Sequence, residues 1–378
     1  MKICLFITTL DKTSGGPSRS VPLLAKGLSE IGVDTTLITC KSKEMNTHIL
    51  SNSKVKLETI PNNISHKMLE EKIMQEGYDL IHCQNLWHPL YHKVAAIARK
   101  NNIPYMMTPR GCLEPWCLKQ KRLKKKLALM LYQKGDLQHA TCILATSDME
   151  AENIRNLNIK APIAIIPNGI DINEYTCRKP FSKPDVKQQV CFISRIHEKK
   201  GLEVLITAWG DISAKYPDWN LVIAGNGEKT YISKLVKMIE EKGLSNSVRI
   251  IPPIFGKEKR NLYYQSAIFI LPSYSENFGM VIAEAMSCGL PVITTTATPW
   301  QDLNKYNLGW CIDLGVENLR LTISNAINKG MDTLFQMGQK GSVYINTTVN
   351  YLAVAQRNKS VYDWILTQSQ KPDFVQLY

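Results

Sequence analysis

The sequence lacks any apolar stretch that approaches the roughly 20 residues of a membrane-spanning helix, so no transmembrane segment is expected. The apolar start of the chain, residues 3–10, is short, ends at Asp11 and has no small-residue cleavage site. We therefore expect a first strand there, not a signal peptide. Internal repeats and low-complexity segments are also missing.

The ten cysteines show no metal-binding spacing. Cys112 and Cys117 fit no zinc pattern, and no pair of histidines completes such a site. Most of the cysteines stand in apolar runs, which favours reduced, buried thiols in a cytoplasmic protein. Two further patterns are absent. The dinucleotide fingerprint G-x-G-x-x-G does not occur, and neither does a nucleic-acid motif with interleaved basic and aromatic residues.

Charge of one sign is in excess. The formal net charge is +13, and residues 1–170 hold 23 Lys and Arg against 14 Asp and Glu, whereas the remainder holds 23 against 19. A basic first half predicts an anionic partner, which can be a nucleic acid, a membrane surface or a phosphorylated substrate.

The length of 378 residues exceeds what one hydrophobic core comfortably holds, so we expect two domains. Predicted strands and helices alternate in both halves, which indicates two doubly wound, Rossmann-like α/β domains facing across a cleft. We place the first domain at residues 1–174 and the second at 175–352, with a proline-bearing linker from Arg178 to Lys187.

The stretch from Leu271 to Thr295 is the most informative one. A buried strand ends at Pro272, a polar loop follows, a helix runs from about Phe278 to Cys288, and a second strand begins after Gly289. The loop therefore stands at the carboxyl end of a strand, where ligands bind in open α/β sheets.

Phosphate is the ligand that this loop suits, because free amides at a helix N-terminus attract anions. The predicted pyrophosphate site is formed by Asn277, Phe278, Gly279 and Met280. Gly279 has no Cβ and so permits close approach to the backbone.

Two carboxylates flank the same loop. Glu284 would then reach a ribose diol and Glu276 a sugar hydroxyl. The alternative is that Glu276 only favours the helix dipole and Glu284 is a surface residue.

The E-x7-E pattern of Glu276 and Glu284, followed by E-A-M-x-C-G-L-P-V-I, resembles the signature of the retaining glycosyltransferases of family 4, which have the GT-B fold. Residues 108–116, TPRGCLEPW, and 298–302, TPWQD, resemble the branch of that family that builds bacterial surface polysaccharides. The resemblance implies that the C-terminal helix and tail, residues 353–378, cross back to the first domain.

Arg195 and Lys200 flank a turn between the predicted strand Val190–Ser194 and the helix that follows it. A guanidinium and an ammonium group suit a diphosphate, although solvated loop charges are the alternative. In the resembling family such an R-x4-K pair neutralises the donor diphosphate. The resemblance therefore implies that Arg195, Lys200 and Glu276 are the catalytic residues.

Three further donor-side features are predicted. Gly15 and Gly16 stand in a loop between a strand and a helix, a phosphate-facing geometry that is also typical of a plain tight turn. Gly225 occupies the turn after the strand Asn220–Ala224. In the resembling family the segment that contains Ile254 lies beside the nucleotide base.

His82, Trp87 and Arg110 are expected on the acceptor side, because His82 and Arg110 stand at or just after strand ends that share one sheet edge. A structural role is the alternative for His82. Many members of the resembling family carry His where Arg110 stands. An arginine cannot accept a proton at neutral pH, so Arg110 would hold a phosphate or a sugar hydroxyl instead.

The most basic stretch runs from Lys119 to Lys134. Leu123, Leu127, Met130 and Leu131 share one face of the helix predicted there, with lysines beside them. Such a helix suits an anionic membrane surface, and a solvated surface helix is the alternative.

The resemblance implies transfer of a hexosyl or N-acetylhexosaminyl group, with retention, from a UDP- or GDP-sugar to a lipid-linked saccharide in capsule, exopolysaccharide or lipopolysaccharide biosynthesis. No D-x-D pair stands in a credible loop, so we expect neither a metal nor any other cofactor. We expect a cytoplasmic enzyme, peripheral at the inner face of the plasma membrane, without a nucleic-acid partner. A nucleotide-sugar epimerase and a non-catalytic nucleotide or nucleic-acid binder are the alternatives.

Overall fold

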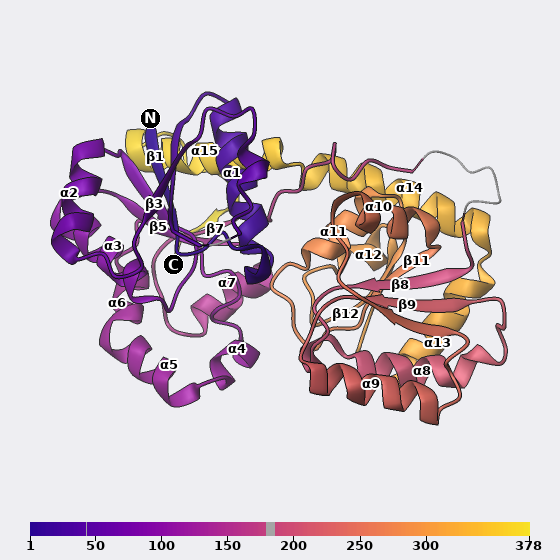
Figure 1. Cartoon of the computed structure of the whole chain (residues 1–378). Helices are drawn as coiled ribbons and strands as arrows, with labels where there is room; N and C mark the ends of the chain where they lie inside the picture. Colours follow the sequence, from indigo (N-terminus) through magenta and orange to yellow (C-terminus); the bar gives the residue numbers. More distant parts are fainter. Residues whose placement is uncertain (43, 179–185) are drawn as a thin grey trace. The chain divides into compact units, whose positions relative to one another are not determined.

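The computed structural model describes residues 1–42, 44–178 and 186–378. The chain forms two compact units (Figure 1). The first domain consists of Met1–Ile170 together with Val349–Tyr378, and the second of Asp171–Thr348. The first domain thus ends at Ile170, where the sequence placed the junction at residue 174. Most of the predicted linker from Arg178 to Lys187 lies outside the described residues.

The first domain is built on an eight-stranded sheet in the order β14-β7-β6-β5-β4-β1-β2-β3, parallel throughout except for β14. Residues alternate between the two faces of β1, since Cys4 and Phe6 enter one apolar core whereas Ile3, Leu5 and Ile7 enter the other. The strands are β1 Lys2–Ile7, β2 Asp34–Cys40, β3 Lys56–Ile60, β4 Leu80–Cys83, β5 Tyr105–Met107, β6 Cys142–Ala145, β7 Ile163–Ile165 and β14 Val375–Gln376.

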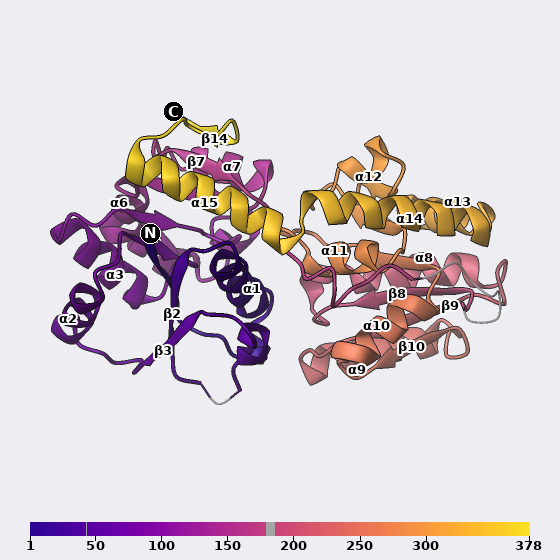
Figure 2. The same ribbon diagram turned by 90° about the horizontal axis from the view of Figure 1, so that it is seen from above.

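Helices cover both faces of this sheet, with α1 and α15 on one face and α2 and α3 on the other (Figures 1 and 2). The helices are α1 Pro17–Glu30, α2 His66–Glu76, α3 Pro89–Lys100, α4 Pro115–Lys119, α5 Arg122–Ala128, α6 Lys134–Gln138, α7 Asp148–Arg155 and α15 Tyr351–Thr367, with 3-10 turns Lys12–Ser14 and Thr47–Leu50 and a π-helical turn Leu129–Gln133.

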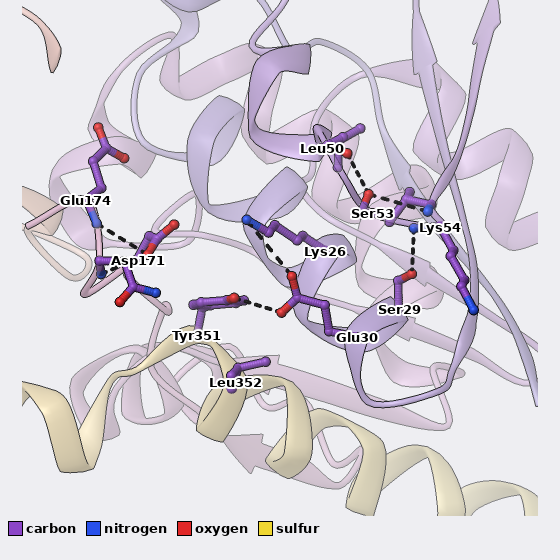
Figure 3. A network of polar contacts seen from close by, with 12 residues as sticks. Lys26, Ser29, Glu30, Leu50, Ser53, Lys54, Asp171, Glu174, Tyr351 and Leu352 are labelled. Atoms are coloured by element: carbon purple, nitrogen blue, oxygen red, sulfur yellow. Dashed lines mark hydrogen bonds and ion pairs between the residues drawn. The ribbon is translucent and has the colours of Figure 1, made fainter.

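The C-terminal helix α15 is fastened to the first domain by specific contacts. The Tyr351 hydroxyl donates to the Glu30 carboxylate on α1 over 2.7 Å, and Lys26 lies above the Tyr351 ring (Figure 3). Near the other end of α15, the Tyr362 hydroxyl is bonded to His82 Nδ1 over 2.8 Å. The last residues of the chain then add β14 to the sheet beside β7.

The second domain has a six-stranded parallel sheet in the order β10-β9-β8-β11-β12-β13. Helices α8 and α9 lie on one side of it, and α10 and α11 on the other (Figure 1). The strands are β8 Gln189–Ile193, β9 Asn220–Ala224, β10 Val248–Ile251, β11 Ile268–Leu271, β12 Val292–Thr295 and β13 Gly309–Ile312. The helices are α8 Leu202–Ser213, α9 Lys229–Glu241, α10 Gly256–Gln265, α11 Met280–Ser287, α12 Asp302–Lys305, α13 Val316–Asn328 and α14 Met331–Thr348, with a 3-10 turn Glu198–Lys200.

Two helices differ from the sequence prediction. The sequence also predicts a helix over residues 334–340, and the structure extends it to α14, Met331–Thr348, because its glycines allow close packing and do not stop it. A Cβ at Gly338 would lie 1.9 Å from the Gly289 carbonyl oxygen, so only glycine permits this approach. The single helix expected from Lys119 to Lys134 is also wrong. Lys121 adopts a left-handed conformation with φ of 51°, which separates α4 from α5.

No helix in the described ranges is long and apolar enough to cross a bilayer.

The buried His82 predicts a pH dependence of the stability of the first domain. Burial, with a smaller contribution from Arg110, lowers the pKa of His82 from 6.5 to about 3. The folded domain therefore keeps His82 neutral, while the unfolded chain protonates it below pH 6.5, and stability is lost as the pH falls. We expect chemical denaturation to show a loss of about 2 kcal/mol from this group between pH 7.5 and pH 5.

The matched variant is His82→Gln, which has no proton to gain. Its unfolding free energy is lower at every pH, but its pH slope in this range is shallower than that of the wild type. Equal slopes would show that His82 is protonated in the folded domain and would contradict the prediction.

Candidate active site

The sheet of the second domain reverses its strand order between β8 and β11. The chain adds β9 and β10 on one side of β8 and then β11, β12 and β13 on the other. Ligands of open α/β sheets bind at the carboxyl ends of the strands at such a point. Arg195 and Lys200 follow β8, and Glu276 and Asn277 follow β11. The structure thus brings the predicted cation pair after β8 and the predicted polar loop after β11 to the same point of the sheet edge.

Lys200 and Glu276 form an ion pair across this point. The same Glu276 oxygen also accepts from the Ser273 hydroxyl over 2.9 Å. The two side chains are only 14% and 13% exposed. Burial by itself would raise the pKa of Glu276, but Lys200 outweighs it and holds this pKa below the ordinary 4.5. The Glu276 carboxylate is therefore charged at neutral pH. The stabilisation by the pair is lost only as the pH falls through the lowered pKa of Glu276.

Hydrogen bonds to backbone carbonyls hold the two loops in place. The Tyr274 amide donates to the Lys199 carbonyl over 2.8 Å, which joins the loop after β11 to the loop after β8. The Glu276 amide donates to Ala297 over 3.0 Å, and the Thr295 hydroxyl donates to the Ser273 carbonyl over 2.6 Å. The ion pair therefore rests on a framework that three neighbouring strands support.

The helix α11 begins directly beside the pair. Gly279 is its N-cap and has φ of 78°, in the left-handed region that favours glycine. The Phe278 carbonyl accepts from the Trp300 indole, and the two rings pack with centroids 5.2 Å apart. Trp300 was not among the sequence-predicted site residues, although it stands in the TPWQD segment. It fixes the entry to the helix whose first amides, near Met280, are the predicted phosphate site.

The remaining donor-side residues lie around this centre with different exposure. Arg195 is exposed, and Ile254 is half-buried in the segment after β10. A Cβ at Gly225 would lie 1.9 Å from the Ser194 carbonyl, so glycine is needed there for backbone packing between the turns after β8 and β9.

Glu284 is placed inside the second domain. Its side chain is 4% exposed, pairs with Lys259 and accepts from the Tyr263 hydroxyl over 3.2 Å. The alternative that Glu284 is a surface residue is therefore wrong, and contact with a ribose stays a prediction. Sequence reasoning missed Lys259 and Tyr263. The four-residue spacing of Lys259 and Tyr263 could have revealed them, because it places both side chains on one face of a helix, and this face of α10 is buried.

His82 joins elements of the fold, contrary to the expectation that it lies on the acceptor side. It is fully buried, and its ring nitrogens are bonded to the hydroxyls of Tyr362 and Thr108 over 2.8 and 2.7 Å. Both nitrogens are satisfied, so His82 joins the first sheet to α15.

Trp87 is half-buried and has φ of 70°. Its indole donates to the Cys112 carbonyl, and Lys125 lies above its ring.

Arg110 stands after β5 and binds three neutral groups, of which sequence reasoning had named none. Its Nη1 donates to Ser20 Oγ over 3.0 Å and to Asn168 Oδ1 over 2.7 Å, and its Nη2 donates to Gln84 Oε1 over 2.6 Å. Gln84 could have been recognised from the sequence, because it is a polar residue that directly follows the buried strand β4. Gly15 and Gly16 are exposed in the turn before α1.

Within the described parts of the chain, no group of three or more His, Cys, Asp and Glu side chains is placed to hold a metal ion. The loops at the β8–β11 point instead bring Arg195, Lys200 and Glu276 toward the amides of a helix N-terminus. Such an arrangement binds a diphosphate and stabilises the charge that develops when a diphosphate departs.

Comparison with known families assigns a model to each half of the chain. The family described as glycosyltransferase family 4 matches residues 14–174, and the one described as glycosyl transferases group 1 matches residues 175–342.

Two curated relatives show the range of similarity. The first is the human phosphatidylinositol N-acetylglucosaminyltransferase, one subunit of which is 26% identical over 81% of this chain and 61% of its own length. The second is the D-inositol 3-phosphate glycosyltransferase of Mycolicibacterium smegmatis, which is 29% identical over 42% of this chain and 38% of its own length. The chain thus matches about four to six tenths of the length of these two relatives.

The structure of HepE from Anabaena in complex with UDP and glucose superposes with a TM-score of 0.76, at 20% identity, over 96% of this chain and 99% of that one. It supports the fold of two Rossmann-like domains. With one family model for each domain, the chain belongs to the glycosyltransferases of the group 1 and family 4 type, which have the GT-B fold.

Proposed function

We propose that this protein transfers a sugar from a nucleotide diphosphate sugar to a saccharide acceptor with retention of anomeric configuration. The observation that carries the proposal is the buried Lys200–Glu276 ion pair at the strand-order reversal, next to the N-terminus of α11. The sugar is a hexosyl or N-acetylhexosaminyl group, and the donor base is uridine or guanosine.

Departure of the nucleotide diphosphate builds negative charge, which the site is equipped to stabilise. Lys200 is held in place by Glu276, and Arg195 is exposed in the same loop, from which we propose that it reaches a phosphate oxygen. The amides of Phe278, Gly279 and Met280 supply fixed dipoles that need no reorganisation during the reaction. We propose that these groups together replace a metal ion.

Glu276 orients the sugar ring, and Glu284 binds the ribose in this proposal. Glu284 pairs with Lys259, which fixes the position of the buried carboxylate. Binding of a ribose hydroxyl therefore requires only an exchange of hydrogen bonds at an oxygen that is already positioned.

The acceptor is proposed to be lipid-linked, and the protein to be peripheral at the cytoplasmic face of a membrane. The apolar side chains of residues 122–131 support this: Leu123 is 83% exposed, Leu127 52%, Met130 74% and Leu131 68%. Lysines beside them complete a surface that suits anionic lipid. A role in bacterial capsule, exopolysaccharide or lipopolysaccharide synthesis is part of the proposal and rests on the TPRGCLEPW and TPWQD segments.

The first test is binding and turnover of the donor. We expect UDP or GDP, but not both equally, to raise the thermal midpoint by several degrees at about 100 times Kd, with the same shift in Mg²⁺ and in EDTA. Slow hydrolysis of the matching nucleotide sugar, followed by NMR, should first release the sugar in the donor's own anomeric form.

Glu284→Gln is the matched variant for donor binding, because it keeps a hydrogen-bonding group for Tyr263 and removes the charge. We expect it to weaken nucleotide binding. No shift of the thermal midpoint with either nucleotide would contradict the proposed donor site. Release of an altered sugar from the donor would favour the nucleotide-sugar epimerase.

Variants of Lys200 and Glu276 distinguish a catalytic role of the ion pair from a purely structural one. Lys200→Met leaves Glu276 charged and poorly solvated, so we expect a loss of about 3 kcal/mol in unfolding free energy and at least a hundredfold loss of donor turnover. The double variant Lys200→Met with Glu276→Gln should regain most of the stability but none of the turnover. Lys237→Met, on the exposed face of α9, is the control. Turnover that returns in the double variant would show that the pair is only structural.

Vesicle binding tests the membrane proposal. We expect cosedimentation with vesicles that contain anionic lipid, and little with neutral ones. Leu127→Ser with Met130→Ser should abolish it without loss of stability, since both side chains are exposed. Lys124→Gln with Lys126→Gln should weaken it by about 1 kcal/mol for each charge. Equal binding of the apolar variant and the wild type would contradict the proposal.

A further inference from the structure

We propose that the first domain has a phosphate-binding site of its own, built around Arg110, and that this site holds a phosphate group of the acceptor. The assignment to the acceptor rests on the proposed function. The existence of the site does not, because it follows from the contacts of Arg110 and its neighbours.

The site stands where the sheet of the first domain reverses its strand order, between β1 and β4. Ser20 comes from α1, which follows β1. Gln84 directly follows β4, Arg110 follows β5 and Asn168 follows β7. Four segments that are distant in the sequence thus converge at the carboxyl edge of one sheet, the edge at which such sheets bind ligands.

The hydrogen-bond partners of the guanidinium are neutral. Ser20 is a hydroxyl, and Asn168 and Gln84 present amide oxygens, at 2.6 to 3.0 Å. Among the residues that the structure describes, the hydrogen bonds of Arg110 go to these neutral groups and not to a carboxylate. Burial lowers the pKa of Arg110 to about 10, so the group stays charged at neutral pH. The guanidinium therefore keeps its positive charge without a direct ion pair among the described residues.

Glu150 is the carboxylate with an electrostatic effect on Arg110, and it is committed elsewhere. Its Oε1 accepts from the Gly111 amide over 2.6 Å, and its Oε2 accepts from the amide and hydroxyl of Thr146. Glu150 thereby holds the chain directly after Arg110. Arg110 itself has φ of 53°, a conformation that costs a bulky residue about 1 kcal/mol or more and that persists at functional sites.

Two buried donors at this place have no partner among the described residues. One is Nε of Arg110, and the other is Nε2 of Gln84, whose side chain is fully buried. An unmade hydrogen bond of a buried polar group costs about 1 to 3 kcal/mol, so two together on adjacent side chains call for a ligand with several acceptor oxygens.

A phosphate meets both requirements, because it brings negative charge and acceptor oxygens at the same time. A sugar hydroxyl accepts a hydrogen bond but leaves the charge unbalanced. The phosphate can belong to the acceptor or to the donor. We assign it to the acceptor, since the second domain has its own cations for the donor diphosphate in Arg195 and Lys200.

Calorimetric titration with inorganic pyrophosphate and with UDP tests the proposal. We expect the wild type to bind pyrophosphate at two sites and UDP at one. Arg110→Gln should remove one pyrophosphate site, or weaken it at least tenfold, and leave the affinity for UDP unchanged. Lys200→Met with Glu276→Gln should remove the other pyrophosphate site and weaken UDP.

The outcomes separate the two sources of phosphate. A tenfold loss of UDP affinity in Arg110→Gln would assign the site to the donor and overturn the proposal, and so would unchanged pyrophosphate binding in this variant. Pyrophosphate binding at Arg110 in a protein that binds neither UDP nor GDP would remove the proposed function but keep the site.

A second variant guards against loss of the fold. Arg110→Lys keeps the charge and loses the fork, so it should retain weakened pyrophosphate binding, between that of the wild type and that of Arg110→Gln. Crystals soaked in tungstate, a phosphate analogue with strong anomalous scattering, locate the ion in the wild type without any substitution. Tungstate in the second domain only, with none at Arg110, would overturn the proposal.

Discussion

The reversal of strand order in each sheet is the constraint on which both candidate sites depend. On the two sides of such a reversal the connections leave toward opposite faces, so the carboxyl ends of two neighbouring strands keep polar loops where a crossover helix would otherwise pack. The reversal lies between β1 and β4 in the first domain and between β8 and β11 in the second. The charged residues of the two sites stand at or next to these points, so topology explains why the sites are where they are.

The two sites differ in how their positive charge is balanced. Lys200 has Glu276 as a counter-ion before any ligand arrives, so a diphosphate must share the ammonium group or displace the carboxylate from it. The pair therefore stabilises the empty protein and moderates affinity, which suits a product that has to leave. Arg110 has only neutral hydrogen-bond partners among the described residues, so an anion there displaces no paired carboxylate.

The sequence predicts the α/β architecture well, because strands of parallel sheets read as short apolar runs and the helices between them carry clear stop signals. It also predicts that Lys200 and Glu276 stand in loops that follow strands, and the structure shows that these two strands are neighbours in the sheet. Burial is harder to foresee. The ion pair that buries Glu284 was not predicted, because its partner, Lys259, stands 25 residues away on another helix. His82 looks like a site residue because its partner Tyr362 is 280 residues away.

The chemistry of the first domain's surface also bears on the acceptor. The exposed apolar side chains of residues 122–131 include four that lie at least half open to solvent, and soluble proteins rarely keep such a group together unless something binds it. The same domain holds an arginine whose described partners are all neutral. An apolar surface flanked by lysines suits the lipid, and the arginine suits the phosphate that joins a lipid to a sugar. These two features arise from separate segments of the chain, and both fit the acceptor proposed above, with a phosphate and a membrane anchor.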